Sequence, residues 1–408
     1  MKHSLTFILS LSMLAATLSA QHSDLNRPFG WANCTTLTSG DDYRVTGGKA
    51  VASPSTITLT STGSDMRSTL IKAINENDII ILDGSKGDFI VSSSMQLKDL
   101  QNKTIVGINN ARVCTEFYLS PELHQLMNDR KVLEQNTSKS DQVLTLSNGK
   151  RVGEPREYLI RQTLIDKMQD PDEKFRNAGL FSLSNCQNII IRNLSLQGPG
   201  AIDVGGNDLL TLSRGSKHVW VDHVDFCDGM DGNFDINSFS DFITVSWCRF
   251  HYTERTYIHA NTNLVGSSDR AEQNGEDNLN VTYAFCEWGE GCDQRMPMVR
   301  FGTIHLLNDY YTCAGNSAAA NPRFQAEFRI EGCYFAEGVK KIFSQKDAKA
   351  FVFVDNHYTE KFKQPENLGN VTLPYRYEAI PVEDVPKVVG EHVGATLSDP
   401  LNISEEPK

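Results

Sequence analysis

The chain has 408 residues, a net charge of −12 at pH 7 and nine cysteines. The negative charge argues against a nucleic-acid partner bound by a broad basic surface. An acidic chain that binds a polyanion must place cations locally, against the field of the whole molecule. Because the number of cysteines is odd, at least one thiol stays unpaired in an exported protein.

The first 20 residues predict a secretory signal peptide. A charged start precedes an apolar run from Leu5 to Leu18, and Ser19 and Ala20 follow. This order is typical of export signals. A membrane anchor is the alternative, but the run is shorter than the ~20 residues that a spanning helix needs. We therefore expect a mature domain over 21–408, export to the periplasm or the medium, and no membrane association.

The next segments predict a helix, two strands and an insertion. Residues 68–75 have the apolar spacing of a short helix, which would cap the open end of a β structure. Residues 78–82 and 103–108 are apolar runs typical of strands. Residues 116–178 lack a strand period, and Pro121–Leu133 and Glu157–Met168 are charged and helix-prone. We expect a helical insertion here.

Seven later segments share the pattern apolar–x–apolar–x–x–x–x–apolar. Their starts differ by 30, 24, 38, 23, 24 and 23 residues, which is a repeat of 23 or 24 with two enlarged units. Such a period indicates a solenoid, and the alternating β-branched runs with Gly, Asn, Asp and Ser between them indicate strands and turns. The starts are Ile189, Val219, Ile243, Val281, Ile304, Phe328 and Phe351.

We predict an all-β fold, a right-handed parallel β-helix built as a single-stranded solenoid in one domain. Equivalent positions of neighbouring coils would then lie ~4.8 Å apart. Residues 385–393 predict a second capping helix, at the far end, and 398–408 predict a loose polar tail.

Three cysteines occupy one position of the repeat. Cys248, Cys286 and Cys333 each come five residues after a repeat start, which favours a buried ladder of free thiols. A disulfide between Cys248 and Cys286 is the alternative. Metal binding by cysteine is not supported, because the chain has no CxxC motif.

Charged residues also recur at matching repeat positions. Asp231 and Arg255 each come 12 residues after a repeat start, in adjacent units. Arg295 belongs to the unit after that of Arg255. If these residues lie on one side of the stack, Asp231 and Arg295 are two coils or ~10 Å apart, which is about the size of a sugar. The complete set comprises Asp208, Asp231, Asp235, Arg255, Arg295 and Arg300.

Each of these residues also has a simpler explanation. Asp231 and Gly232 form a turn signal, and a single arginine is by default a surface cation. The clustering favours a site. Three carboxylates suit a hard cation such as Ca²⁺, and arginines that face the cation suit a carboxylated substrate.

Three motifs together resemble the pectate lyases of polysaccharide lyase family 1. The likeness runs from Gly30 to Ala395 and skips the insertion. It implies a secreted, monomeric, Ca²⁺-dependent enzyme that cleaves α-1,4-linked polygalacturonate by β-elimination and leaves a 4,5-unsaturated uronide. The motifs are Val219-Trp220-Val221-Asp222-His223, Asp231-Gly232-Asn233-Phe234-Asp235 and Arg295-Met296-Pro297-Met298-Val299-Arg300-Phe301-Gly302.

The resemblance also implies the ligands of the cation. The family's Ca²⁺ ligands match Asp208, Asp231 and Asp235. Asp208 is one residue out of step relative to the Val-Trp motif, and Asp231 stands where some members have Glu.

For the arginines, the resemblance implies a catalytic and a binding role. Arg295 matches the residue that removes the C5 proton, and Arg300 the residue that binds a substrate carboxylate. Arg255 stands where most members have Lys, so its place in catalysis and substrate binding rests on its charge. Arginine keeps its proton in water to above about pH 12, so a basic Arg295 requires an electropositive site. A stabilising role is the alternative.

Three alternative functions are compatible with a β-helix: a pectin lyase, a polygalacturonase and a non-catalytic glycan-binding protein. A pectin lyase acts on methyl-esterified chains without Ca²⁺ and typically lacks the acidic cluster, which this chain retains. A polygalacturonase needs two carboxylates that flank a water, and its Asn-Thr-Asp and Gly-His-Gly motifs are absent. A non-catalytic glycan-binding β-helix is expected to have lost Arg295.

Overall fold

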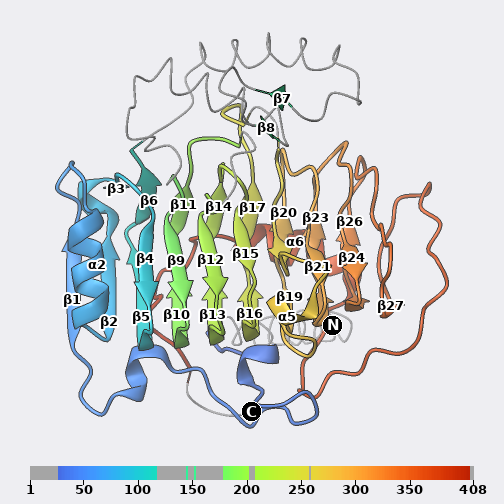
Figure 1. Cartoon of the computed structure of the whole chain (residues 1–408), viewed down its shortest axis with the longest axis horizontal. Coiled ribbons are helices and arrows are strands. Elements are labelled where there is room, and N and C mark those ends of the chain that lie inside the picture. The colour runs from blue at the N-terminus through green and yellow to red at the C-terminus, as the bar shows by residue number, and fades with distance from the viewer. Residues whose placement is uncertain are drawn as a thin grey trace, which may run out of the picture.

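The computed structural model describes residues 26–116, 144–145, 151–152, 178–201, 207–256 and 259–404. In these residues, three parallel sheets of ten, eight and seven strands wind around one axis (Figure 1). Each regular coil passes from the ten-stranded sheet A to the eight-stranded sheet B and then to the seven-stranded sheet C. The predicted right-handed parallel β-helix is confirmed.

Sheet A contains the repeat motifs. All seven predicted starts pair in register with one another, from Ile189 opposite Val219 to Phe328 opposite Phe351. The early strands predicted at 78–82 and 103–108 are β2 and β5. The strands are β1 (Thr56–Thr60), β2 (Ile79–Asp83), β5 (Gln101–Ile108), β10 (Gln187–Arg192), β13 (Lys217–Asp222), β16 (Asp241–Ser246), β19 (Val281–Ala284), β22 (Thr303–Leu307), β25 (Glu327–Glu331) and β27 (Ala350–Val354).

Sheets B and C complete each coil. Sheet B consists of β3 (Phe89–Val91), β6 (Arg112–Thr115), β11 (Ser195–Gln197), β14 (Asp225–Cys227), β17 (Arg249–His251), β20 (Glu287–Trp288), β23 (Tyr310–Tyr311) and β26 (Tyr334–Phe335). Sheet C consists of β4 (Met95–Lys98), β9 (Phe181–Ser184), β12 (Leu210–Ser213), β15 (Phe234–Ile236), β18 (Leu264–Val265), β21 (Met298–Arg300) and β24 (Asn321–Phe324).

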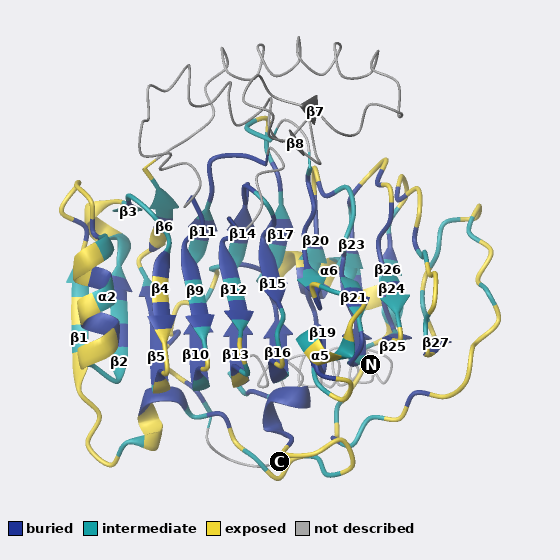
Figure 2. Ribbon diagram, viewed as in Figure 1, coloured by how far each residue is buried: buried dark blue, intermediate teal, exposed yellow. Residues whose placement is uncertain are grey.

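The core runs along the inside of the three sheets, where buried residues follow one another from coil to coil (Figure 2). On the inner side of sheet B, aromatic rings stack in one file: Phe226, Phe250, Trp288, Tyr311 and Phe335, with centroids 4.9, 5.5, 4.8 and 4.4 Å apart. All nine cysteines are free. The three cysteines at the shared repeat position are buried, so the predicted thiol ladder is confirmed.

One predicted capping helix is confirmed and the other lies elsewhere. Helix α2 (Arg67–Glu76) buries Leu70, Ala73 and Ile74 against the core at the N-terminal end. Helix α6 (Val385–His392) does not close the far end of the stack. Its valines pack sideways against Trp247, Phe285 and Leu307, which belong to three successive coils.

The remaining short elements lie in connections. They are the 3₁₀ helices η2 (Gly30–Asn33), η3 (Gly47–Ala50), η4 (Gly84–Lys86) and η7 (Val382–Asp384), the helix α5 (Ala271–Asn274), and the antiparallel pair β7 (Leu144–Thr145) and β8 (Arg151–Val152). The predicted signal peptide and the helix-prone parts of the insertion, 121–133 and 157–168, lie outside the described residues. Among the residues described, no helix has the length and apolar character needed to span a membrane.

The tail expected to be loose is instead packed as far as it is described. Ile403 is buried against Trp220 and Ile190. The guanidinium of Arg192, which is fully buried, donates hydrogen bonds to the carbonyl oxygens of Pro400 and Asn402 at 3.2 and 3.0 Å. A buried cation needs such acceptors, and this need explains why the segment is ordered.

Candidate active site

The register of sheet C determines which way the predicted site residue Asp235 points. Thr211 of β12 pairs with Asp235 of β15, and the next residue, Ile236, pairs with Val265 of β18, which pairs with Val299 of β21. Side chains alternate along a strand. Asp235 therefore points away from the core on the same face as Thr211, while Ile236 and its partners point inward.

Three oxygen atoms converge above Gly232. A Cβ atom at this position would lie 2.9 Å from Oδ1 of Asp208, 3.3 Å from Oδ1 of Asp235 and 3.4 Å from the carbonyl oxygen of Asn261. A side chain of any kind would fill this space. Glycine therefore keeps open a small volume that is lined by two carboxylates and a carbonyl, which are the ligand types that hard cations prefer.

The two carboxylates are only partly satisfied by hydrogen bonds. Oδ2 of Asp208 accepts a hydrogen bond from the Thr211 hydroxyl at 3.1 Å, and Oδ1 of Asp235 accepts one from the backbone N–H of Leu264 at 3.0 Å. Oδ1 of Asp208 is buried and has no hydrogen-bond partner among the described residues. An orphaned anionic oxygen is costly, and it points into the space above Gly232.

Burial and mutual repulsion disfavour the charged forms of both groups. Burial raises the pKa of Asp208 well above its usual range, and the negative charges of Asp235 and Asp231 raise it further. Burial and the charge of Asp231 raise the pKa of Asp235 to about 7. The positive charge of Arg295 opposes both shifts. These four residues thus form one electrostatic cluster that has an excess of negative charge.

Asp231 belongs to this cluster but faces a different partner. Its Oδ1 lies 3.1 Å from Nε2 of His259, and Nδ2 of Asn261 lies 2.9 Å from the same nitrogen. In the described part of the chain, no three His, Cys, Asp or Glu side chains meet in a metal-binding arrangement. The oxygens that converge are those of two carboxylates and one backbone carbonyl. The sequence analysis missed His259 and Asn261, because they precede β18 in the enlarged unit and form no motif.

Arg295 comes three residues before β21, and Arg300 is the last residue of that strand. Arg295 has a backbone φ of 62°, in the left-handed region, and its carbonyl oxygen accepts a hydrogen bond from the N–H of Asn263 at 2.7 Å. Such a backbone is costly for a residue other than glycine and is common at functional sites. Arg300 lies at the end of the strand, where its Nε is 2.6 Å from Oδ1 of Asp269 and its Nη1 donates to the Gly266 carbonyl oxygen at 3.0 Å.

Counted from sheet B, Arg255 matches Asp231, because each comes four residues after one member of the aligned pair His251 and Cys227. Sheet B aligns His251 with Cys227, and sheet C aligns Val265 with Ile236. The connection therefore contains 13 residues in the Arg255 coil and eight in the Asp231 coil, so the two positions differ when counted from sheet C. Burial raises the pKa of the Cys114 and Cys227 thiols, and the charge of Arg255 opposes that rise. Arg255 thus lies near the sheet B side of the turn.

Fold and site together define a parallel β-helix protein with an acidic, arginine-flanked site on one sheet. Solved pectate lyases share this fold. A pectate lyase from Bacillus sp. N165, solved in complex with trigalacturonate, aligns with a TM-score of 0.57 and 19% identity over 90% of this chain and 98% of that one. A pectate lyase from Bacillus subtilis gives a TM-score of 0.58 and 18% identity over 90% and 96% of the two chains.

The pectate lyase family model matches residues 155–383, which is more than half of the chain. The chain belongs to the pectate lyase family. Relatives include a pectate trisaccharide-lyase from Thermotoga maritima, 35% identical over 44% of this chain and 48% of the relative. Pectate lyase A from Aspergillus niger is 32% identical over 52% of this chain and 64% of its own length. The chain therefore spans only about half to two thirds of these relatives.

Proposed function

We propose that the protein is a Ca²⁺-dependent pectate lyase, which cleaves α-1,4-linked polygalacturonate by β-elimination. The observation that carries this proposal is the convergence of Asp208 and Asp235 oxygens above Gly232, inside a cluster that includes Arg295. Family membership supports the reaction. The trigalacturonate bound to the Bacillus sp. N165 pectate lyase supports the substrate class.

The residues present fit a Ca²⁺ ion. Asp208, Asp235 and the Asn261 carbonyl would hold it, with Asp231 beside them as a further ligand or source of negative charge. The fit rests on the orphaned Oδ1 of Asp208 and on two carboxylates whose pKa values are raised, first by burial and then by neighbouring negative charge. Ca²⁺ bound here would supply positive charge next to a uronate carboxylate, where negative charge develops in the reaction.

We assign the proton transfer to Arg295. In β-elimination, C5 loses its proton, the C5–H electron pair forms the C4–C5 double bond, and the C4–O bond breaks. The departing oxygen then takes a proton from water. Arg295 would accept the C5 proton or, as the alternative, stabilise the negative charge that the substrate develops. Arg255 is proposed to assist, and to contact substrate, from its turn.

Arg300 is proposed to bind a substrate carboxylate. Its guanidinium already holds the carboxylate of Asp269 at 2.6 Å. A uronate carboxylate has the same shape and charge, and the guanidinium fork can bind either one. Substrate binding would thus exchange one carboxylate for another at Arg300 rather than desolvate an isolated cation.

The N-terminal pattern supports export, and we further propose that the mature protein is a monomer. We propose that the signal peptide at 1–20 directs the chain to the periplasm or the medium. Mass spectrometry of the mature protein would show whether residue 21 is its first, and size-exclusion chromatography would show whether it is a monomer.

The reaction is tested with purified protein and polygalacturonate, by following the absorbance of the 4,5-unsaturated product. We expect product formation by the native chain and none by Arg295→Lys, which keeps the charge but changes the geometry. Circular dichroism should show that the variant is folded. An Arg295→Lys variant that retains most of the activity would refute the role of Arg295.

A further inference from the structure

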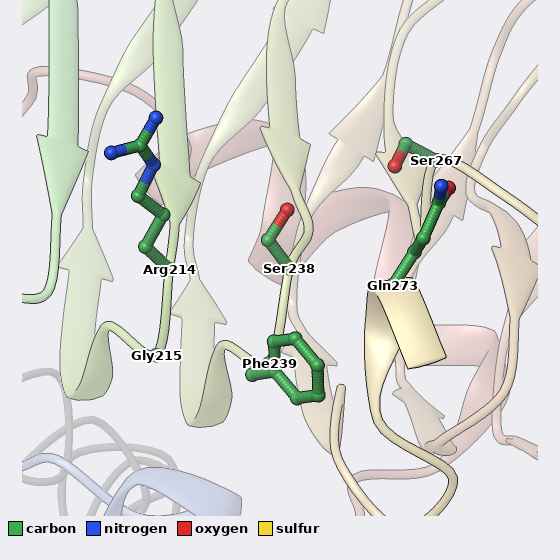
Figure 3. A pocket seen from close by; sticks show the side chains of 6 residues that line it. All are labelled: Arg214, Gly215, Ser238, Phe239, Ser267 and Gln273. Carbon is green, nitrogen blue, oxygen red and sulfur yellow. The ribbon is translucent and has the colours of Figure 1, made fainter. Parts of the chain in front are cut away.

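A pocket lies beside the candidate active site, at the turns that lead from sheet C to sheet A. It has a volume of about 540 Å³. Figure 3 shows Arg214 on one side, Ser267 and Gln273 on the other, and Ser238 and Phe239 between them. Its lining comprises Arg214, Gly215, Ser238, Phe239, Ser267 and Gln273.

The register of sheet C shows where this pocket lies relative to the site. Leu212, Ile236, Val265 and Val299 form one row across four coils. Asp235 comes one residue before this row, and Arg300 one residue after it. Three pocket residues come two residues after the row, in successive coils: Arg214, Ser238 and Ser267. The pocket therefore lies ~10 Å from Asp235 along the strand direction, on the Arg300 side.

Phe239 presents an exposed aromatic ring to this pocket. Its exposed fraction is 45%, the largest of any large apolar residue in the described ranges. Its φ of 66° and the φ of 50° at Ser238 lie in the left-handed region, which is unfavourable for bulky side chains. The backbone N–H of Phe239 is held by the Asn274 carbonyl oxygen at 2.9 Å. A strained backbone that keeps an aromatic ring in water is typical of a binding surface.

Arg214 supplies a cation without a carboxylate partner. Its side chain is exposed, and within the described ranges no ion pair to it is found. In a chain with a net charge of −12, an unpaired arginine beside the site is a local positive centre. Its planar fork suits a carboxylate, while Ser267 and Gln273 offer hydrogen bonds for hydroxyl groups.

We propose that Arg214 and Phe239 form a further subsite for an acidic sugar of the substrate chain, beyond Arg300. The apolar face of a pyranose ring would pack on Phe239, and its carboxylate would bind Arg214. This inference rests on the proposed function, which supplies the uronate class. It adds that a long polygalacturonate chain runs along the strands of sheet C and gains affinity from a sugar that takes no part in the chemistry.

The test compares Arg214→Ala and Phe239→Ala with the native chain and with Lys217→Ala, an exposed cation that does not line the pocket. We expect each pocket variant to raise KM for polygalacturonate by roughly 1.5- to 5-fold, the range typical of one exposed ion pair. Neither should change kcat, nor KM for the shortest cleavable oligogalacturonide, which does not reach the pocket. Arg214→Lys should restore part of the affinity.

Direct binding separates this subsite from the proposed reaction. In the Arg295→Lys background, calorimetry with long oligogalacturonides should show the same loss of affinity on Arg214→Ala, and a smaller loss with methyl-esterified chains. If the native chain cleaves polygalacturonate but the pocket variants bind and react like Lys217→Ala, the subsite is wrong and the lyase stands. If binding is lost in the variants but the native chain does not cleave, the subsite stands and the lyase fails. Absence of both binding and cleavage overturns both.

Discussion

At the residue scale, burial and repulsion between like charges both disfavour the ionised carboxylates of the site. Asp208 and Asp235 are buried beside each other and near Asp231, so their charged forms are unfavourable unless a cation is present. Gly232 keeps the space between their oxygens open. The same feature that would make the site bind a cation therefore makes the cation-free protein less stable when the carboxylates ionise.

The pH dependence of stability follows from the raised pKa values of these carboxylates. Burial and the charge of Asp231 raise the pKa of Asp235 to about 7 in the folded chain, from the ordinary aspartate value of 3.8. The folded state thus holds the proton more tightly, and without Ca²⁺ stability should fall as pH rises from about 4 to about 7. Thermal unfolding in a chelator should show this fall, and Asp235→Asn should flatten it. An unchanged profile in Asp235→Asn would contradict the assignment.

Gly232→Ala tests the space directly. The added methyl group would lie 2.9 Å from Oδ1 of Asp208, so the oxygens could no longer converge on a cation. We expect Ca²⁺ affinity, measured by calorimetry at pH 8, to fall at least about tenfold, which corresponds to ~1.4 kcal/mol. The matched control is Gly390→Ala in α6, where an added Cβ meets nothing within 4 Å. Equal Ca²⁺ affinity in Gly232→Ala and the native chain would exclude this site.

The sequence predicted these residues to different degrees. Asp208, Asp235 and Arg295 come together because the register of the sheet places residues at similar offsets in neighbouring coils close to one another. Arg255 keeps its spacing relative to sheet B but not relative to sheet C, because the extra residues of its turn lie between the two sheets, where no strand fixes register. The group that Asn261 contributes is its backbone carbonyl. Every residue type has such a carbonyl, so only the folded turn shows that this one lies at the site.

At the scale of elements, the strands follow from pattern and the helices only in part. Alternation and period predicted every strand of sheet A from β10 onward, because each coil repeats the same inward positions. The apolar face of α6 predicted a helix but not the surface it covers. That surface is built by Trp247, Phe285 and Leu307, which come from separate coils and become neighbours only in the stack.

The aromatic file inside sheet B should carry much of the stability. Trp288 is fully buried between Phe250 and Tyr311, and its Nε1 donates to Oδ1 of Asn263 at 2.8 Å. We expect Trp288→Ala to lower the free energy of unfolding by ~3–5 kcal/mol and Trp288→Phe by less, measured by urea denaturation. Phe239→Ala, at an exposed ring, should stay within ~0.5 kcal/mol of the native chain. Similar effects at both positions would contradict the packing described.

At the scale of the whole molecule, the C-terminal segment ties the coils together across their outer face. It passes α6, reaches the Arg192 guanidinium and buries Ile403 beside Trp220. A polar composition alone suggested a loose end, because nothing in the tail's sequence indicates that a buried arginine about 200 residues earlier, already paired with Asp222, donates further hydrogen bonds to tail carbonyls.

Removal of the tail should therefore destabilise the fold. Deletion of 398–408 removes two carbonyl acceptors of a buried guanidinium, and hydrogen bonds to charged groups contribute ~1.5–3 kcal/mol each. We expect a fall of several degrees in the melting temperature followed by circular dichroism. Deletion of 405–408 alone, which leaves those acceptors in place, serves as the control. Equal melting temperatures for the two deletions would restore the loose-tail prediction.

The central claim is that a cation at Asp208 and Asp235 makes this β-helix a lyase. The most direct measurement follows the absorbance of the unsaturated product during incubation with polygalacturonate, first with a chelator and then after Ca²⁺ is restored in excess. We predict no product in the chelator and full recovery with Ca²⁺, whereas Gly232→Ala should need at least about tenfold more Ca²⁺ than the native chain for the same recovery. Product formation at the same rate with and without the chelator would contradict the claim.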